Sequence, residues 1–218
     1  MKFQRPSFLY PLFSEITLIP GIGPKTFKLL ENKIGKNVID LLFHFPHTVI
    51  NRLCNLDLKH CPTNSIITKK ILITKHISNF YNPRRPYKLI GHCENFEIEI
   101  VFFNYKGKYI EKNFPVNSVV IVSGKINRFN QIVKFTNPDY IYEVNQINKI
   151  PKFEPIYPLT AGINNKLLRK YIRHAIKLIP PDLPEWIPNK IILENNWPTF
   201  SEALRFIHIP NSMIEVDN

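Results

Sequence analysis

Residues 95–104 read Asn95-Phe96-Glu97-Ile98-Glu99-Ile100-Val101-Phe102-Phe103-Asn104, and their alternation indicates a β-strand. Successive side chains of a strand point to opposite faces, so the aromatic and isoleucine side chains from Phe96 to Phe102 share the face that enters a core. Phe103 belongs to the opposite face, with the two glutamates. The pattern therefore predicts a phenyl ring in water at the end of this strand.

An exposed ring of this kind suits a protein that stacks on an unpaired base while lysine and arginine hold the phosphates. The chain of 218 residues has 29 Lys and Arg against 17 Asp and Glu, a formal net charge of +12. This charge favours polyanionic partners, either nucleic acid or an acidic lipid surface. The alternative for Phe103 is that the following loop covers its ring.

Further β-rich runs lie on both sides of this stretch. The five predicted strands are Ile66–Ile77, Tyr87–Cys93, Phe96–Phe103, Val119–Ile126 and Ile132–Thr136. With a short helical insert at Lys106–Lys112, they match a small five-stranded barrel of the oligonucleotide-binding (OB) type. Gly124 inside the fourth strand indicates a bulge or the tight coiling that such a barrel requires.

Helical segments flank the predicted barrel. Short helices are expected at Pro24–Glu31 and after Asn37, which can cap a turn. Residues 164–179 predict one strong amphipathic helix, with an apolar stripe that packs on the barrel and a basic opposite face. The Pro-rich stretch at 180–198 predicts an extended connection, followed by a short helix around Phe200–Ile207.

The sequence thus predicts a mixed, mainly β chain in three parts. An N-terminal helical segment with a hairpin-like turn occupies residues 1–60, and the OB barrel occupies residues 61–145. A Pro-rich connection with helices occupies residues 146–218.

Several classes of protein are disfavoured. No run of about 18 apolar residues occurs, and the N-terminus lacks the features of a secretory signal, so we expect a cytoplasmic protein without membrane association. Cys54, Cys61 and Cys93 are odd in number and form no C-x-x-C pair, which argues against a disulfide framework and a structural zinc site. No catalytic, metal or cofactor constellation emerges, so autonomous enzyme activity is not expected.

The turn Pro20-Gly21-Ile22-Gly23-Pro24-Lys25-Thr26 superficially resembles a nucleotide-binding P-loop. Its upstream glycine is missing and Pro24 separates Gly23 from Lys25, so it is not an ATP site. The residues fit a hairpin between two short helices, where free amides and Lys25 can hold a phosphate. A purely structural corner is the alternative.

The segment Asn82-Pro83-Arg84-Arg85-Pro86-Tyr87-Lys88 lies between the first two predicted strands, where an OB barrel places a ligand-facing loop. The planar guanidinium of arginine suits phosphate because it donates two hydrogen bonds at once, and Tyr87 can stack. A solvated charged loop is the alternative here, as it is for the basic face of the 164–179 helix.

Short motifs along nearly the whole chain occur in one characteristic order and spacing. They are Leu18-Ile19-Pro20-Gly21-Ile22-Gly23-Pro24-Lys25, Asp40-Leu41-Leu42-Phe43-His44-Phe45-Pro46, Arg85-Pro86-Tyr87-Lys88, Phe102-Phe103-Asn104, Asn137-Pro138-Asp139-Tyr140, Pro155-Ile156-Tyr157-Pro158-Leu159-Thr160 with Gly162, Leu168-Arg169, and Ala203-Leu204-Arg205 with Ile207-His208. In these motifs the chain resembles the opening of the bacterial ATP-dependent DNA helicase RecG.

The resemblance implies a wedge domain, an OB barrel that grips a stalled replication fork and splits both arms while a separate ATP-driven motor pulls the duplex. It implies that Phe103 and Tyr109 are the paired aromatics that cap orphan bases at the branch point, with Phe102 as the inward partner. The chain carries Pro46-His47-Thr48-Val49-Ile50-Asn51-Arg52 where the family has a Pro-Arg-Arg-Tyr-x-Asp-Arg pattern, and so loses charged groups from a local ion-pair network.

The chain stops at Asn218, where the family enters its linker helix and motor, so the Walker A lysine, the DExH carboxylates and the arginine finger are absent. We therefore expect no ATP hydrolysis by this chain alone, and ATP and Mg²⁺ only in a separate motor.

The resulting hypothesis is a monomeric module for DNA repair and recombination that binds branched DNA, including stalled forks and Holliday-type junctions. Phe103 and Tyr109 are the expected base-stacking residues. The residues expected to hold the DNA backbone are cationic: Lys25, Arg84, Arg85, Lys88, Lys106, Lys108, Lys125, Arg128, Arg169 and Arg173. The alternatives are a subunit or degraded remnant of a split RecG-type helicase with a separately encoded motor, and a structured-RNA-binding OB protein.

Overall fold

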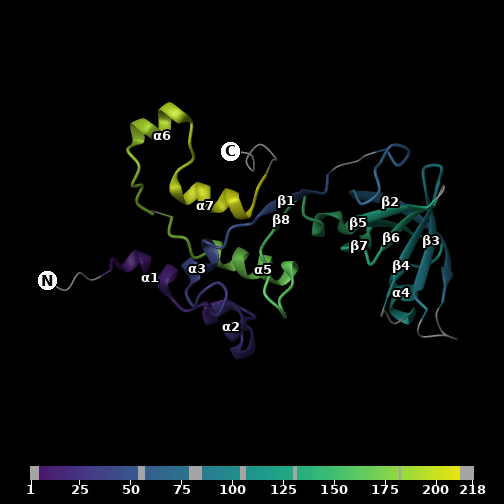
Figure 1. Cartoon of the computed structure of the whole chain (residues 1–218), viewed down its shortest axis with the longest axis horizontal. Helices are drawn as coiled ribbons and strands as arrows, with labels where there is room; N and C mark the ends of the chain where they lie inside the picture. The colour runs from purple at the N-terminus through teal and green to yellow at the C-terminus, as the bar shows by residue number, and fades with distance from the viewer. Residues whose placement is uncertain are drawn as a thin grey trace. The chain divides into compact units, whose positions relative to one another are not determined.

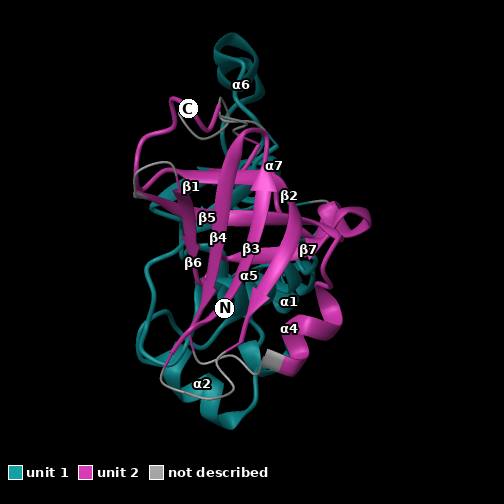
Figure 2. Cartoon of the chain, turned by 90° about the vertical axis from the view of Figure 1, so that its right-hand side faces the viewer, with its two compact units in different colours: residues 1–50, 153–218 teal, residues 51–152 magenta. Residues whose placement is uncertain are grey.

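The computed structural model describes residues 5–53, 57–78, 85–103, 107–129, 132–181 and 183–211. The chain forms two compact units (Figure 2). Residues 51–152 form one, here called the barrel unit, and residues 1–50 with 153–218 form the other, here called the helical unit. Among the described residues, no helix is long and apolar enough to cross a membrane.

The barrel unit contains a closed five-stranded barrel (Figure 1), which confirms the predicted OB-type fold. Its strands are β2 (Ile66–Ile77), β3 (Tyr87–Cys93), β4 (Phe96–Phe102), β5 (Val119–Phe129) and β6 (Ile132–Thr136). They are hydrogen-bonded in the order β2-β3-β4-β6-β5, and β5 pairs back with β2 to close the barrel. The β4–β6 pair is parallel and the other pairs are antiparallel. An additional strand, β7 (Tyr140–Glu143), pairs with β5, and a 3₁₀ segment (Val144–Lys149) follows it.

Strand β4 follows the alternation predicted from its sequence along most of its length. Ile98, Ile100 and Phe102 are buried in the barrel core, whereas Glu97 is exposed. Val101, which belongs to the outer face by the same alternation, is nevertheless fully buried. The helix α4 (Gly107–Asn113) lies beside the barrel near the end of β4 (Figure 2). Ile110 from this helix reaches the same core, as does Phe114 directly after it.

Two glycines allow strands and turns to approach closely in the barrel. Strand β2 pairs with β5 along its first half and with β3 along its second half, with a register shift between Ile73 and Lys75. A Cβ on Gly91 would lie 2.5 Å from the carbonyl oxygen of Leu72 at this bend. Gly124 pairs in regular register with Ile67, so the predicted bulge is absent there. Its lack of a side chain instead admits the 137–139 turn, because a Cβ would lie 3.0 Å from Pro138 Cα.

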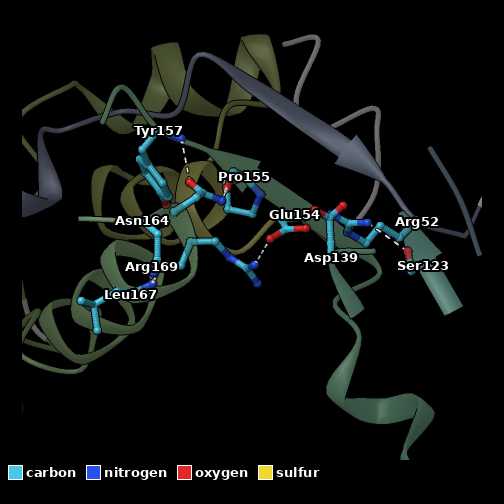
Figure 3. Close-up of polar contacts among 10 residues, drawn as sticks. Arg52, Ser123, Asp139, Glu154, Pro155, Tyr157, Asn164, Leu167 and Arg169 are labelled. Atoms are coloured by element: carbon cyan, nitrogen blue, oxygen red, sulfur yellow. Dashed lines mark hydrogen bonds and ion pairs between the residues drawn. The ribbon is translucent and has the colours of Figure 1, made fainter. Parts of the chain in front are cut away.

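Arg52 makes an ion pair inside the barrel unit (Figure 3). Its guanidinium lies 2.9 Å from a carboxylate oxygen of Asp139 and donates a hydrogen bond of 2.9 Å to the hydroxyl of Ser123. The guanidinium carbon is also 4.8 Å from the centroid of the Tyr140 ring. Residues 46–52, which depart from the family pattern, therefore still contribute an ion pair, through Arg52.

The helical unit combines the two ends of the chain. Its elements are 3₁₀ turns at Ser7–Leu9 and Ile16–Leu18, and the helices α1 (Tyr10–Phe13), α2 (Pro24–Glu31), α3 (Val38–Leu42), α5 (Asn165–Ile176), α6 (Asn189–Asn195) and α7 (Phe200–His208). Strands β1 (Thr48–Asn51) and β8 (Phe153–Ile156), which the sequence did not predict, pair with each other where the chain passes between the units.

Local sequence signals account for most of the helix starts. Asn164 caps α5 by accepting a hydrogen bond of 2.8 Å from the backbone N–H of Leu167, as its position predicted. Asn37 and Asp40 form a reciprocal capping box at α3. The prediction of an extended connection at 180–198 was wrong in part, because α6 forms there within a proline-free run and is followed by Asn196 in the left-handed conformation.

The N-terminal and C-terminal helical segments, which the sequence separated at residues 60 and 145, share one core. The apolar stripe of α5, which includes Leu168 and Tyr171, packs with Ile16, Leu30 and Leu41 from the first 50 residues. This stripe was expected to pack on the barrel. The structure places it in the helical unit instead, because α1 to α3 supply enough apolar surface to cover it.

Arg169 is buried in the helical unit, which corrects its assignment to the DNA-binding surface. Only 7% of the residue is exposed, and its guanidinium forms an ion pair with the carboxylate of Glu154 on β8 (Figure 3). Glu154 is buried as well. A phosphate could reach this guanidinium only by displacing a buried carboxylate, so Arg169 has a structural role.

We expect Arg169→Ala to lower the free energy of unfolding of the helical unit by about 3 to 5 kcal/mol, because it leaves Glu154 buried without its charge partner. Arg173→Ala, on the exposed face of the same helix, is the matched control and is expected to change it by about 0.5 kcal/mol or less. Chemical denaturation measures both values. Equal and small effects of the two substitutions would contradict the structural role of Arg169.

Candidate nucleic-acid interface

Phe103 follows β4 directly and is 46% exposed, which confirms the exposure that the alternation predicted. Its backbone N–H donates a hydrogen bond of 2.9 Å to the side-chain carbonyl of Asn137. This contact comes from the turn after β6, the parallel neighbour of β4. The ring is thus held at a fixed point of the barrel, although it lies outside the core.

Phe103 lines a surface hollow of about 430 Å³ in the barrel unit. The other residues around this hollow come from β2, β3, β4, β6 and the segment before β3: Ile77, Ser78, Arg85, Pro86, Lys88, Val101 and Lys134. One aromatic ring and three cationic side chains therefore gather in one place. We call this set of residues the Phe103 hollow.

Glu99 partly balances the cations of the Phe103 hollow. Its carboxylate forms an ion pair with Lys88, and Lys134 lies 3.9 Å from its second oxygen. The strand registers explain this grouping, because Glu99 is opposite Lys134 in the β4–β6 pair, and Lys88 lies on β3, the other neighbour of β4. Arg85 is exposed and adds a further positive charge. The described side chains of the hollow therefore carry a net positive charge, which suits phosphate.

Tyr109 lies on α4 and is 59% exposed. The neighbouring Ile110 is fully buried, so anchoring of the helix by Ile110 leaves Tyr109 on its outer side. Lys108 is exposed next to it. Phe103 and Tyr109 are thus separated in the sequence by five residues. Residues 104–106 of this segment, including Lys106, lie outside the described part of the chain.

The remaining predicted cations occupy different environments. Lys125 on β5 and Lys25 on α2 are exposed. Arg128 is half-buried, donates a hydrogen bond of 3.1 Å to the backbone carbonyl of Lys59, and lies 5.6 Å from the Phe96 ring. Its guanidinium is therefore used largely in packing. Arg84 lies outside the described residues.

The turn that carries Lys25 has the predicted geometry. Gly21 has a φ of +96°, which favours glycine, and Pro24 occupies the first turn of α2. The hydroxyl of Tyr171 on α5 donates a hydrogen bond of 2.9 Å to the carbonyl of Gly21. This contact gives the turn a structural role within the helical unit.

Four exposed cations recur on one face of α5 and its C-terminal end. They are Lys166, Lys170, Arg173 and Lys177. Spacings of three and four residues place side chains on the same face of a helix. Arg173 is thus accessible, in contrast to Arg169.

Lys134 belongs to the Phe103 hollow but was absent from the residues predicted to hold DNA. The alternation of β6 places Val133 and Phe135 in the core and Lys134 on the opposite face, so period-two reasoning could have identified it as exposed. Its neighbours could not have been predicted locally, because β4 and β6 pair in parallel across an intervening helix and strand.

Cys61 and Cys93 are buried thiols without disulfide bonds, and burial raises the pKa of Cys93. Cys54 lies outside the described residues. Within the part of the chain that the structure describes, no group of three or more His, Cys, Asp or Glu side chains is placed to hold a metal ion.

Comparisons with known proteins connect this fold with one family. A family model described as the RecG wedge domain matches residues 15–179. A RecG ATP-dependent DNA helicase from Staphylococcus epidermidis is 29% identical over 195 residues, which cover 88% of this chain and 27% of that protein. The corresponding Bacillus subtilis protein is 27% identical over 210 residues, with coverages of 91% and 28%.

A solved structure of RecG bound to a three-way DNA junction superimposes on this chain with a TM-score of 0.77 at 20% sequence identity. The superposition includes all of this chain and 29% of the RecG chain. At this sequence identity, the similarity establishes a shared fold. The chain spans only about a quarter of the length of the curated relatives it matches. Because the family model matches most of its residues, this chain belongs to the RecG wedge domain family.

Proposed function

We propose that this chain binds branched DNA, such as stalled replication forks and Holliday-type junctions, and separates strands at the branch point. The observation that carries this proposal is the Phe103 ring, exposed at the edge of a hollow lined by Arg85, Lys88 and Lys134. In this role an unpaired base stacks on the ring while the cations hold the flanking phosphates. Tyr109 supplies the second stacking surface.

Energetic magnitudes set the limit of what these residues do alone. Stacking of a base on an aromatic side chain contributes about 1 to 3 kcal/mol. One base-pair step of duplex DNA is stabilised by about 1.4 kcal/mol. The two rings can therefore hold open a pair that has frayed at a junction, but they cannot open successive pairs without an external source of energy. The chain then acts as a monomeric cytoplasmic wedge in DNA repair and recombination, without cofactor or ATP hydrolysis of its own.

A second candidate function is that of a subunit in an active helicase whose motor lies on another polypeptide. Large apolar side chains are exposed in residues 186–197, namely Trp186 (73%), Ile191 (40%), Leu193 (75%) and Trp197 (52%). Exposed apolar patches of this kind mark protein interaction sites. The curated relatives are DNA helicases whose remaining length exceeds the part that this chain matches, so a motor is the partner we propose for the patch.

We expect a RecG-type motor fragment to hydrolyse ATP faster with fork DNA when this chain is added, and we expect Leu193→Asp to abolish the stimulation. The charge would be buried without a partner at the docking surface. Leu18→Asp replaces another exposed leucine of the helical unit, one outside residues 186–197, and is the matched control that should retain most of the stimulation. The steady-state rate of ATP hydrolysis is measured for each combination. If the unmodified chain does not stimulate the motor fragment, the subunit hypothesis is rejected and only the DNA-binding function remains.

The affinity for fork DNA should fall as salt rises. For contacts to about six phosphates of a duplex, we expect the logarithm of the affinity to decrease against the logarithm of salt concentration with a slope near −5. Fluorescence anisotropy of a labelled fork measures this slope. A flat response would contradict the phosphate contacts, and stronger competition by transfer RNA than by unlabelled fork DNA at one salt concentration would favour an RNA-binding protein instead.

Phe103→Ala should weaken fork binding by about tenfold or more and leave binding to an unbranched duplex nearly unchanged, because only a branch point offers unpaired bases. Phe43→Ala removes another exposed phenyl ring, one that lies in the helical unit, and is the matched control. Titrations with fork DNA and with unbranched duplex give the loss of affinity of each variant for each substrate. Equal losses on fork and duplex would remove Phe103 from the junction role.

A further inference from the structure

Three side chains form a hydrogen-bonded chain that runs from β2 through β3 to α4. The hydroxyl of Tyr87, which is fully buried at the start of β3, donates to a carboxylate oxygen of Glu111 over 3.0 Å. Nδ1 of His76 on β2 lies 2.7 Å from the same hydroxyl oxygen. The two rings meet edge to face, with centroids 5.9 Å apart and an interplanar angle of 83°.

The direction of each hydrogen bond follows from the number of protons available. Tyr87 has one hydroxyl proton, and a carboxylate can only accept, so this proton belongs to the bond with Glu111. His76 must then donate through Nδ1–H to the tyrosine oxygen. Burial, together with the hydrogen bond to Glu111, raises the pKa of Tyr87, so its hydroxyl remains a donor at neutral pH. The order is therefore His76 to Tyr87 to Glu111.

These three residues connect the two parts of the candidate interface from inside the barrel unit. His76 directly precedes Ile77 and Ser78, which line the Phe103 hollow. Tyr87 is opposite Phe102 in the β3–β4 pair, one residue before Phe103. Glu111 lies on α4, two residues after Tyr109.

The orientation of α4 depends on its contacts with the rest of the barrel unit. It contains seven residues, and a helix this short is not stable by itself in water. Ile110 and Phe114 anchor this segment in the barrel core through apolar contacts, which place Tyr109 on the outer side but are not directional. The hydrogen bond from Tyr87 is directional, so it can restrict the remaining rotation of the helix about its own axis and thereby hold the Tyr109 ring in one direction on that side.

We propose that Tyr87 is a positioning residue which, through Glu111 and with His76 as its own donor, holds α4 so that Tyr109 can stack at the branch point together with Phe103. This inference rests on the proposed function of the site. Tyr87 would thus contribute to junction recognition although its side chain is buried and cannot contact DNA itself. Tyr87 itself, which the sequence offered as a stacking residue, cannot stack on a base because it is fully buried.

The test is a double-mutant cycle on fork affinity with Tyr87→Phe and Tyr109→Ala. Tyr87→Phe removes only the hydroxyl and keeps the ring in the core. In the unmodified chain we expect Tyr109→Ala to lower fork affinity by about fivefold or more. In the Tyr87→Phe background we expect the same substitution to lower it by less than about twofold, because Tyr109 is no longer held in place. Affinity for an unbranched duplex should stay constant throughout.

A second pair of variants tests the same bond from Glu111, whose side chain is exposed. Glu111→Ala should reproduce the effect of Tyr87→Phe, whereas Glu111→Gln should retain fork affinity, because its amide oxygen can still accept the hydroxyl proton. Tyr142→Phe on β7 controls for the loss of a tyrosine hydroxyl elsewhere in the barrel unit. Thermal unfolding reports whether each variant is folded.

The outcomes separate the positioning role from the proposed function. If Tyr109→Ala weakens fork binding by the same factor with and without the Tyr87 hydroxyl, the positioning role is overturned and the stacking role of Tyr109 stands. If Tyr109→Ala has no effect in the unmodified chain, both are overturned for this residue. Equal losses in Glu111→Gln and Glu111→Ala would also contradict the positioning role.

Discussion

Closure of the barrel by β5 is the constraint on which the other features of this molecule depend. Because β5 pairs with both β6 and β2, the five strands enclose one core and each strand has a fixed inner face. The inner face of β4 ends at Phe102, which leaves the next ring, Phe103, outside at the point where the strand leaves its ladder. The exposure of this aromatic residue is thus a direct consequence of a strand that ends at its last core position.

The same closure brings charges of both signs together around that ring. Glu99 lies between Lys88 and Lys134 because β4 lies between β3 and β6. A carboxylate near a phosphate site is unfavourable by itself, but here it holds two lysines beside the hollow, and Arg85 is exposed next to them. The arrangement therefore combines a positioned ring with positioned cations, which is the combination that single-stranded segments of nucleic acid require.

Period-two alternation and helix-capping signals were sufficient to predict the five strands, the exposure of Phe103 and the capping of α5 by Asn164. Predictions failed where the deciding partner is distant in sequence. The spacing of Arg169 in the sequence places it on the basic face of α5. Its side chain is nevertheless buried, because it forms an ion pair with Glu154 on the unpredicted strand β8. Lys134 joins the Phe103 hollow only through a parallel pairing that no local pattern encodes.

The most direct test of the central claim is to identify the residue that contacts the base at the branch point. A fork with a single 5-iodouracil at that position can be irradiated in complex with the chain, and the cross-linked residue identified by mass spectrometry. We expect cross-links at Phe103 or Tyr109 when the analogue is at the branch point, and their loss when it is moved into the duplex arms. Cross-links confined to other residues, or the same yield at both positions, would contradict it.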